Sequence, residues 1–216
     1  MLTCGRWIIT AVAMLTLGGC SIIRPAPVVQ NQTMRIPAGA LKRIAVLPFG
    51  HRDTMRSSSE VGGTSPEIAA ELVARFITDA MAKRGIQVIP ASDLSTALNS
   101  QGLRPTDINP RTAAELAASK FGATAILIGQ VSRYRERQGE RFGSTGAASV
   151  AFNVTIYTAD PVQRVWSSQF DETQRPLSEH IVNARRYPGG GMRWLTAAEL
   201  AQWGAQSAVA ALPAQH

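Results

Sequence analysis

The most specific chemistry in this sequence belongs to the four residues Leu17-Gly18-Gly19-Cys20. They match a lipobox, in which the cysteine thiol takes a diacylglyceryl group and a signal peptidase cuts before the cysteine. Residues 7–17 are uncharged and follow Arg6, as expected for the positive start and short apolar core of a secretory signal. This apolar core is too short to span a bilayer, because a transmembrane helix needs about 20 apolar residues. An ordinary signal peptide with an incidental cysteine is the alternative.

The cysteine content agrees with this interpretation. The chain holds only Cys4 and Cys20, and the first would be removed with the signal. Lipidation of the second leaves no disulfide in the mature monomer. Two or three acyl chains, at roughly 0.8 kcal/mol per buried methylene, anchor a protein durably. Ser21 follows the cysteine, and lipoproteins with serine rather than aspartate at this position resemble those that are sent to the outer membrane. We therefore expect a lipid-anchored protein at the outer membrane that faces the periplasm.

A second group of candidate residues consists of arginines. Arg133, Arg135 and Arg137 occupy every second position, so on one strand they share a face, and Arg141 extends the positive surface into a hairpin tip. Guanidinium groups bind carboxylate and phosphate bidentately. This face is therefore predicted to dock an envelope protein partner, an anionic glycan or lipid headgroups. An exposed strand edge whose charges deter aggregation is the alternative.

The segment 187–194 combines two aromatic residues with three consecutive glycines. This composition is typical of a loop that presents a tryptophan and an arginine, here Trp194 and Arg193, to a partner. Alternatively, Trp194 folds back as a hydrophobic staple beside a helix cap at Thr196.

Enzyme motifs are missing from the sequence. It contains no phosphate-binding loop, dinucleotide-binding glycine pattern, zinc-binding His pair, calcium loop or nucleophile elbow. His51 and Asp53 are interpreted as a solvated loop pair, with a cell-wall hydrolase that uses His51 as an alternative. We predict no catalytic residue, no metal and no cofactor. The net charge of +7 suits an anionic partner, and export excludes nucleic acid.

The elements that must position these residues follow from hydrophobic periodicity and helix caps. We expect a signal peptide at 1–19, a lipidated cysteine with a flexible tether at 20–40, and one domain at 41–216. Twenty extended residues would hold that domain ~65 Å from the bilayer. Strands are predicted at 43–49, 86–89, 123–134, 149–158 and 165–173, and helices at 65–85, 92–98, 109–122, 177–185 and 196–212. This order implies an α/β fold with a single mixed β-sheet flanked by helices.

Several of these segments together resemble the curli-secretion lipoprotein (CsgG-like) superfamily. They are Arg43-Ile-Ala-Val-Leu-Pro-Phe49, the helix that ends at Lys-Arg-Gly85, Ile86-Gln-Val-Ile89 and Phe121-Gly-Ala-Thr-Ala-Ile-Leu-Ile-Gly-Gln130. The resemblance covers roughly residues 42–175. This superfamily includes lipoprotein activators of penicillin-binding proteins and lipoproteins of exopolysaccharide export, and its fold is similar to the TolB amino-terminal domain. The resemblance implies non-catalytic envelope proteins that act by binding and often form homo-oligomeric rings.

Curli-type members also build an outer-membrane pore from amphipathic hairpins, and this chain departs from that pattern. Its segment 130–150 carries arginines on one face and a glycine-rich tip. Arginine on a lipid face at the bilayer midplane costs about 2–4 kcal/mol. We therefore predict an accessory or assembly factor in envelope biogenesis or secretion, with a pore-forming channel subunit as the alternative.

Overall fold

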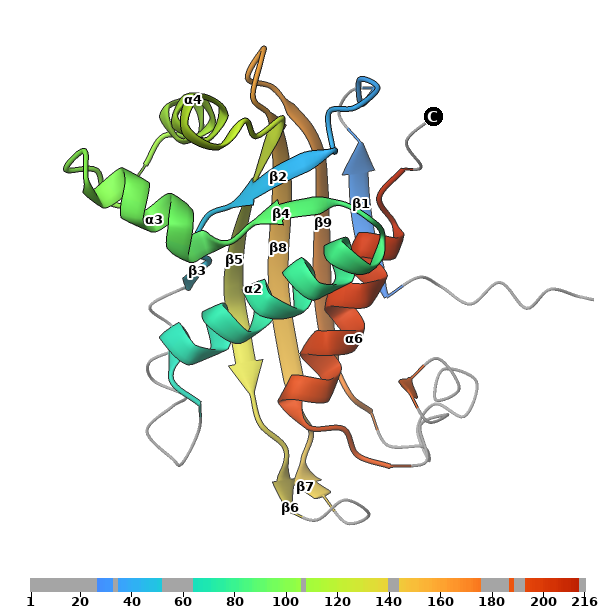
Figure 1. Cartoon of the computed structure of the whole chain (residues 1–216). Helices are drawn as coiled ribbons and strands as arrows, with labels where there is room; N and C mark the ends of the chain where they lie inside the picture. Colours follow the sequence, from blue (N-terminus) through green and yellow to red (C-terminus); the bar gives the residue numbers. More distant parts are fainter. Residues whose placement is uncertain are drawn as a thin grey trace, which may run out of the picture.

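The computed structural model describes residues 27–32, 35–51, 64–105, 108–139, 144–175, 187–188 and 193–213 (Figure 1). The predicted signal peptide, Cys20, Arg141 and the helix expected at 177–185 lie outside the described residues. Within the described ranges, no helix is long and apolar enough to span a bilayer.

One mixed β-sheet of seven strands organises the chain, in the order β1-β9-β8-β5-β2-β4, with β3 beside β5. The strands are β1 (Val28–Gln32), β2 (Arg43–Val46), β3 (Gly50–His51), β4 (Gln87–Ile89), β5 (Ala125–Arg135), β8 (Ser149–Thr158) and β9 (Arg164–Thr173). The short strands β6 (Gln138–Gly139) and β7 (Ser144–Gly146) form a separate hairpin. Strands β2, β4 and β5 are parallel, whereas β5, β8, β9 and β1 pair antiparallel. The predicted α/β fold with a mixed sheet is confirmed.

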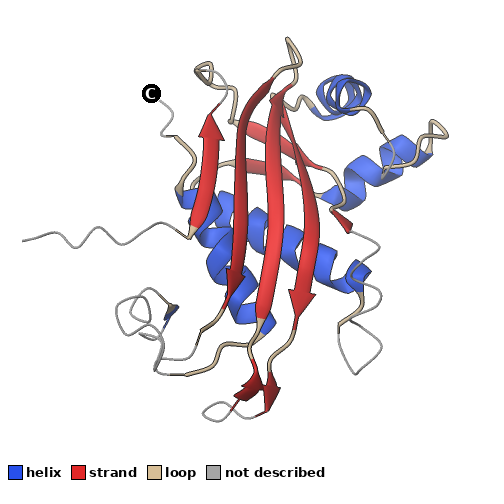
Figure 2. Cartoon of the chain, turned by 180° about the vertical axis from the view of Figure 1, so that it is seen from behind, coloured by secondary structure: helices blue, strands red, loops and turns tan. Residues whose placement is uncertain are grey.

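Helices cover the two faces of this sheet unequally. The described helices are α2 (Pro66–Lys83), α3 (Ala91–Asn99), α4 (Pro110–Phe121) and α6 (Ala197–Ala210). Helices α2 and α6 lie side by side across one face (Figure 1), over the larger hydrophobic core. Helices α3 and α4 pack on the other face over a smaller core, near β2 and β4. Figure 2 shows that most of β5, β8 and β9 carries no described helix on this second face, which we call the open face.

Local sequence signals fix where two of the helices begin and end. The Ser65 hydroxyl accepts the N–H of Ile68 at 3.3 Å, and Pro66 is the first helical residue of α2. The Asn109 side chain likewise accepts the N–H of Arg111 at 2.8 Å before α4. Gly122 ends α4 in the left-handed conformation, with φ of 63°. These predicted starts and ends are confirmed.

Helix α6 approaches the sheet closely because of one glycine. A Cβ atom at Gly204 would lie 2.7 Å from Cδ1 of Phe170 on β9. Leu200 and Ala208 belong to the same stripe of α6 and are buried, and Leu212, two residues beyond the end of the helix, is buried as well. The predicted contact of this stripe with a sheet is confirmed.

The sheet begins earlier than the sequence indicated. Residues 28–32, predicted as part of the tether, form β1 and pair with β9 from Val28 opposite Phe170 to Gln32 opposite Trp166. The tether prediction was wrong here because only Val28 of this strand is buried, so no alternating pattern marks it. Seven residues, 21–27, lie between Cys20 and the first residue of β1. Fully extended, the chain from Cys20 to Val28 reaches roughly 26 Å, less than half the predicted length.

Candidate partner-binding surface

A β-bulge in β5 sets the direction of its arginines. The pairing with β8 shifts between Val131, opposite Phe152, and Arg133, opposite Ala151. Val131 and Tyr134 are both buried in the larger core although they lie three positions apart. A regular strand would turn Arg133 to the same face as Val131. The bulge instead turns Arg133 and Arg135 to the open face.

These two arginines differ in what they contact. Arg133 donates from Nε to the Ser149 hydroxyl at 2.5 Å and from Nη2 to the Asp171 carboxylate. The Ser149 hydroxyl also forms a 2.6 Å hydrogen bond with Thr173. Arg135 is exposed, and its side chain contacts no polar group among the described residues. Arg133 is therefore committed to the sheet, whereas Arg135 is available to a partner.

Arg137 lies beyond the end of β5 and turns toward α6. Its Nη1 donates to the backbone carbonyl of Trp194 at 3.2 Å. The neighbouring Glu136 carboxylate accepts the N–H of Ala197, the first residue of α6, at 3.0 and 3.2 Å. A carboxylate at this helix end is favourable because the end carries a partial positive charge. The prediction that all three arginines share one face was thus wrong for Arg137.

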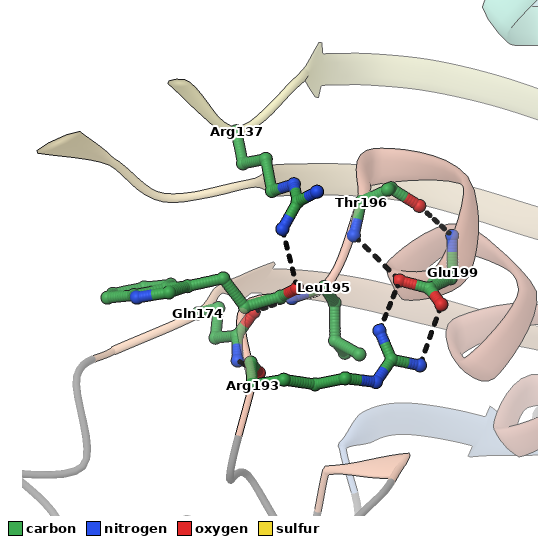
Figure 3. A network of polar contacts seen from close by, with 7 residues as sticks. Arg137, Gln174, Arg193, Leu195, Thr196 and Glu199 are labelled. Carbon is green, nitrogen blue, oxygen red and sulfur yellow. Dashed lines mark hydrogen bonds and ion pairs between the residues drawn. The ribbon is translucent and has the colours of Figure 1, made fainter. Parts of the chain in front are cut away.

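A polar network fixes the segment before α6 (Figure 3). The Gln174 side chain donates to the Arg193 carbonyl at 2.8 Å and accepts the Leu195 N–H at 2.6 Å. Thr196 and Glu199 form the predicted capping box. Leu195, which is fully buried, occupies the position before this cap. The staple alternative for Trp194 was therefore wrong, since Trp194 lies one residue earlier and is only half-buried.

Arg193 also belongs to this network. It donates to both carboxylate oxygens of Glu199, each at 2.7 Å. These hydrogen bonds are the main reason that the pKa of Glu199 falls to about 2, helped by the backbone N–H of Thr196. On the strand side, burial together with the charge of Glu136 raises the pKa of Tyr134 to about 12. The Arg193 guanidinium is thus occupied by Glu199 and is not available to a partner.

The structure thus brings together Arg137, Arg193 and Trp194. Arg135, at the end of β5, faces the open side of the sheet, whereas Arg137 turns toward α6. We call Arg135, Arg137 and Trp194, which lie at this end of the sheet, the arginine–tryptophan surface. Sequence reasoning missed Glu136 and Gln174, which hold it in place, because a polar residue after a strand carries no signal for a distant backbone amide. Among the described residues, no group of three or more His, Cys, Asp or Glu side chains could hold a metal.

Comparison with known proteins finds only distant likenesses. No family model and no curated protein matches the chain. Among solved structures, the LpoB C-terminal domain from Escherichia coli is 20% identical, with a TM-score of 0.42 over 65% of this chain and 87% of that one. The PelC dodecamer from Paraburkholderia phytofirmans is 18% identical, with a TM-score of 0.39 over 68% and 79%. Lipoprotein GNA1162 from Neisseria meningitidis is 20% identical, with a TM-score of 0.40 over 63% and 84%.

Proposed function

We propose that this chain is an outer-membrane-anchored, periplasm-facing lipoprotein that acts without catalysis, as an accessory or assembly factor in envelope biogenesis or secretion. It docks an acidic segment of an envelope protein on the arginine–tryptophan surface. The observation that carries this proposal is the exposed Arg135 guanidinium, which has no polar partner among the described residues.

Charge balance supports an acidic partner. Arg133 and Arg193 are paired with Asp171 and Glu199. Among the described residues, the Arg137 side chain donates to the backbone carbonyl of Trp194 and forms no ion pair, so its charge and that of Arg135 are not matched by an acid there. Arginine binds a carboxylate with two parallel hydrogen bonds, which favours an aspartate- or glutamate-rich segment.

The frame behind this surface favours binding as well. The Glu136 carboxylate joins β5 to α6, and Gln174 joins β9 to the segment before α6. A surface fixed in this way loses little side-chain and loop freedom when a partner binds, so more of the contact energy appears as affinity. Half-buried Trp194 adds an aromatic group of the kind that dominates interface energies.

The anchor defines where this binding takes place. Lipidation at Cys20 with roughly 26 Å of chain before β1 confines the domain to a thin layer beside the membrane. Confinement raises the effective concentration of the domain for a partner in the same layer. A Cys20→Ser variant should leave the outer-membrane fraction, and one that stays there would contradict the anchor.

Cross-linking in intact cells tests the docking surface. Arg135→Glu combined with Trp194→Ala should abolish the main cross-linked product, while the amount of protein in the membrane stays unchanged. Arg111→Glu is the matched control, since Arg111 is exposed on α4 at the opposite end of the sheet (Figure 1). The mass of the product distinguishes an envelope protein from a second copy of the chain. An unchanged product in the double variant would overturn the proposal.

A further inference from the structure

A second candidate site lies on the open face, beside the connection between α3 and α4. A groove of about 260 Å³ lies there, between Pro105 and Ile108 on one side and the sheet on the other. Its apolar walls include Pro48, Pro105 and Ile108. This volume lies just below the roughly 300–1,000 Å³ of pockets for drug-sized ligands, so the groove suits one small ring.

The floor of the groove is a patch of uncharged hydrogen-bonding groups on β5 and β8. Gln130 and Asn153 lie directly opposite each other in the strand ladder, and Thr155 and Tyr157 follow at alternate positions on the same face. None of these four side chains forms a hydrogen bond with a described residue. Amides both donate and accept, and hydroxyls do the same, so the floor matches a ligand that carries hydroxyl and amide groups.

All the described residues that line the groove are uncharged. An anionic or cationic ligand would lose its hydration against these residues without meeting an opposite charge among them, which is unfavourable. An extended peptide is also disfavoured. Strand β5 is already paired on one side with β8 and on the other with β2 and β3, so a peptide cannot add to the sheet through its backbone at this place.

The groove is held in shape by the strands behind it. Gly50 pairs with Gln130, and this pairing fixes the segment that carries Pro48. On the opposite face, the Phe49 ring occupies the space of a missing side chain at Gly129, where a Cβ atom would meet the ring at 2.3 Å. A preformed site of this kind needs little reorganisation to bind.

We propose that this groove binds a neutral sugar ring bearing an N-acetyl group, as part of a glycan strand. The amides of Gln130 and Asn153 hydrogen bond to the acetamido group and the ring hydroxyls. The proline rings and the Tyr157 ring contact the apolar face of the sugar. Adjacent rings of the strand extend toward Gln169 on β9, which lies opposite Asn153 in the ladder. The site is separate from the arginine–tryptophan surface.

Calorimetric titration of the full mature lipoprotein in detergent micelles tests this site, with chitotetraose as the neutral acetamido probe. We expect saturable binding that Asn153→Ala weakens roughly five- to tenfold, the effect of losing one or two hydrogen bonds. Gln206→Ala removes an exposed amide on α6, over the opposite face of the sheet, and should leave the affinity unchanged. Cellotetraose, which lacks acetamido groups, should bind more weakly, and tetragalacturonate should not bind.

Several outcomes would overturn the assignment. The first is that chitotetraose shows no saturable binding up to about 10 mM, a concentration that corresponds to a barely favourable association. The second is that the Asn153→Ala variant binds chitotetraose as tightly as the natural chain. The third is that the protein prefers tetragalacturonate. If cellotetraose bound with the same affinity as chitotetraose, the proposed recognition of the acetamido group would be wrong. Circular dichroism of the variants tests whether a loss of binding is due to unfolding. We expect the Asn153→Ala variant to stay folded because Asn153 is exposed.

Discussion

Arg193 donates hydrogen bonds to both carboxylate oxygens of Glu199, each at 2.7 Å, and Glu199 in turn accepts the N–H of Thr196 at 2.9 Å. One carboxylate therefore closes the capping box of α6 and holds the segment before it. This contact lowers the pKa of Glu199 from its ordinary value of 4.5 to about 2. Because the pKa is lower in the folded state, the stabilisation is complete above pH 4.5 and is lost as the pH falls toward 2.

Glu199→Gln tests this relationship, since glutamine keeps a capping oxygen but not the charge. At pH 7 the variant should be about 1 kcal/mol less stable than the natural chain, a value typical of helix caps and partly exposed ion pairs. Near pH 2 the two proteins should have the same stability. Urea denaturation across this range measures the difference, and parallel pH profiles would contradict the role of the ion pair.

The helix ends could be predicted because each depends on residues close together in sequence. The end groups of α2 and α4 are satisfied by residues next to each helix, namely Ser65 with Pro66, Asn109 with Pro110, and Gly122. Local chemistry therefore decides where these helices begin and end. Helix α3 shows the limit of this reasoning. Its predicted cap at Ser92 was wrong, because the helix begins at Ala91 after Pro90 and the Ser92 hydroxyl bonds to Asp93 instead.

Features that depend on strand pairing could not be predicted in the same way. Strand β1 buries one residue of five, so its existence follows from β9 and not from its own sequence. The bulge after Val131 decides which face receives Arg133, yet the run 131–137 alternates as a regular strand would. The fold likewise decides that Arg133 pairs with Asp171 and that Arg193 pairs with Glu199.

The close packing of α6 gives a second prediction. Gly204→Ala should destabilise the chain, although alanine favours a helix by about 1 kcal/mol over glycine. The new methyl group would lie 2.7 Å from the Phe170 ring, and overpacking costs about 1–3 kcal/mol. We expect a net loss of about 1 kcal/mol in thermal or urea unfolding.

Phe170→Leu provides the control for this prediction, because a smaller side chain makes room for the methyl group. The double variant should be more stable than the sum of the two single effects predicts. If Gly204→Ala raised the stability on its own, as at an exposed helix position, α6 would not lie against Phe170.

The third prediction follows from the different contacts of Arg133 and Arg135, which lie two residues apart on β5. Arg133→Ala should cost about 1 kcal/mol, because the fully buried Ser149 hydroxyl loses one hydrogen bond and Asp171 loses its cation. Arg135→Ala should change stability by less than about 0.5 kcal/mol, as expected for an exposed side chain.

Partner binding should follow the opposite order. Arg135→Ala should weaken the cross-linked product, whereas Arg133→Ala should leave it largely intact at a temperature where the variant is folded. Equal effects of both substitutions on binding would show that Arg133, as well as the arginine–tryptophan surface, contacts the partner.

The last prediction concerns a buried hydroxyl on β9. Ser168 is 3% exposed, and within the described part of the chain its hydroxyl has no hydrogen-bond partner. Burial of such a group costs about 1–3 kcal/mol. Ser168→Ala removes the unpaired oxygen and leaves only a small void, so we expect the free energy of unfolding to rise by about 1 kcal/mol. Ser167→Ala, at a half-buried position on the opposite face, should change it little. A loss of stability in Ser168→Ala would reveal a partner for this hydroxyl outside the described residues.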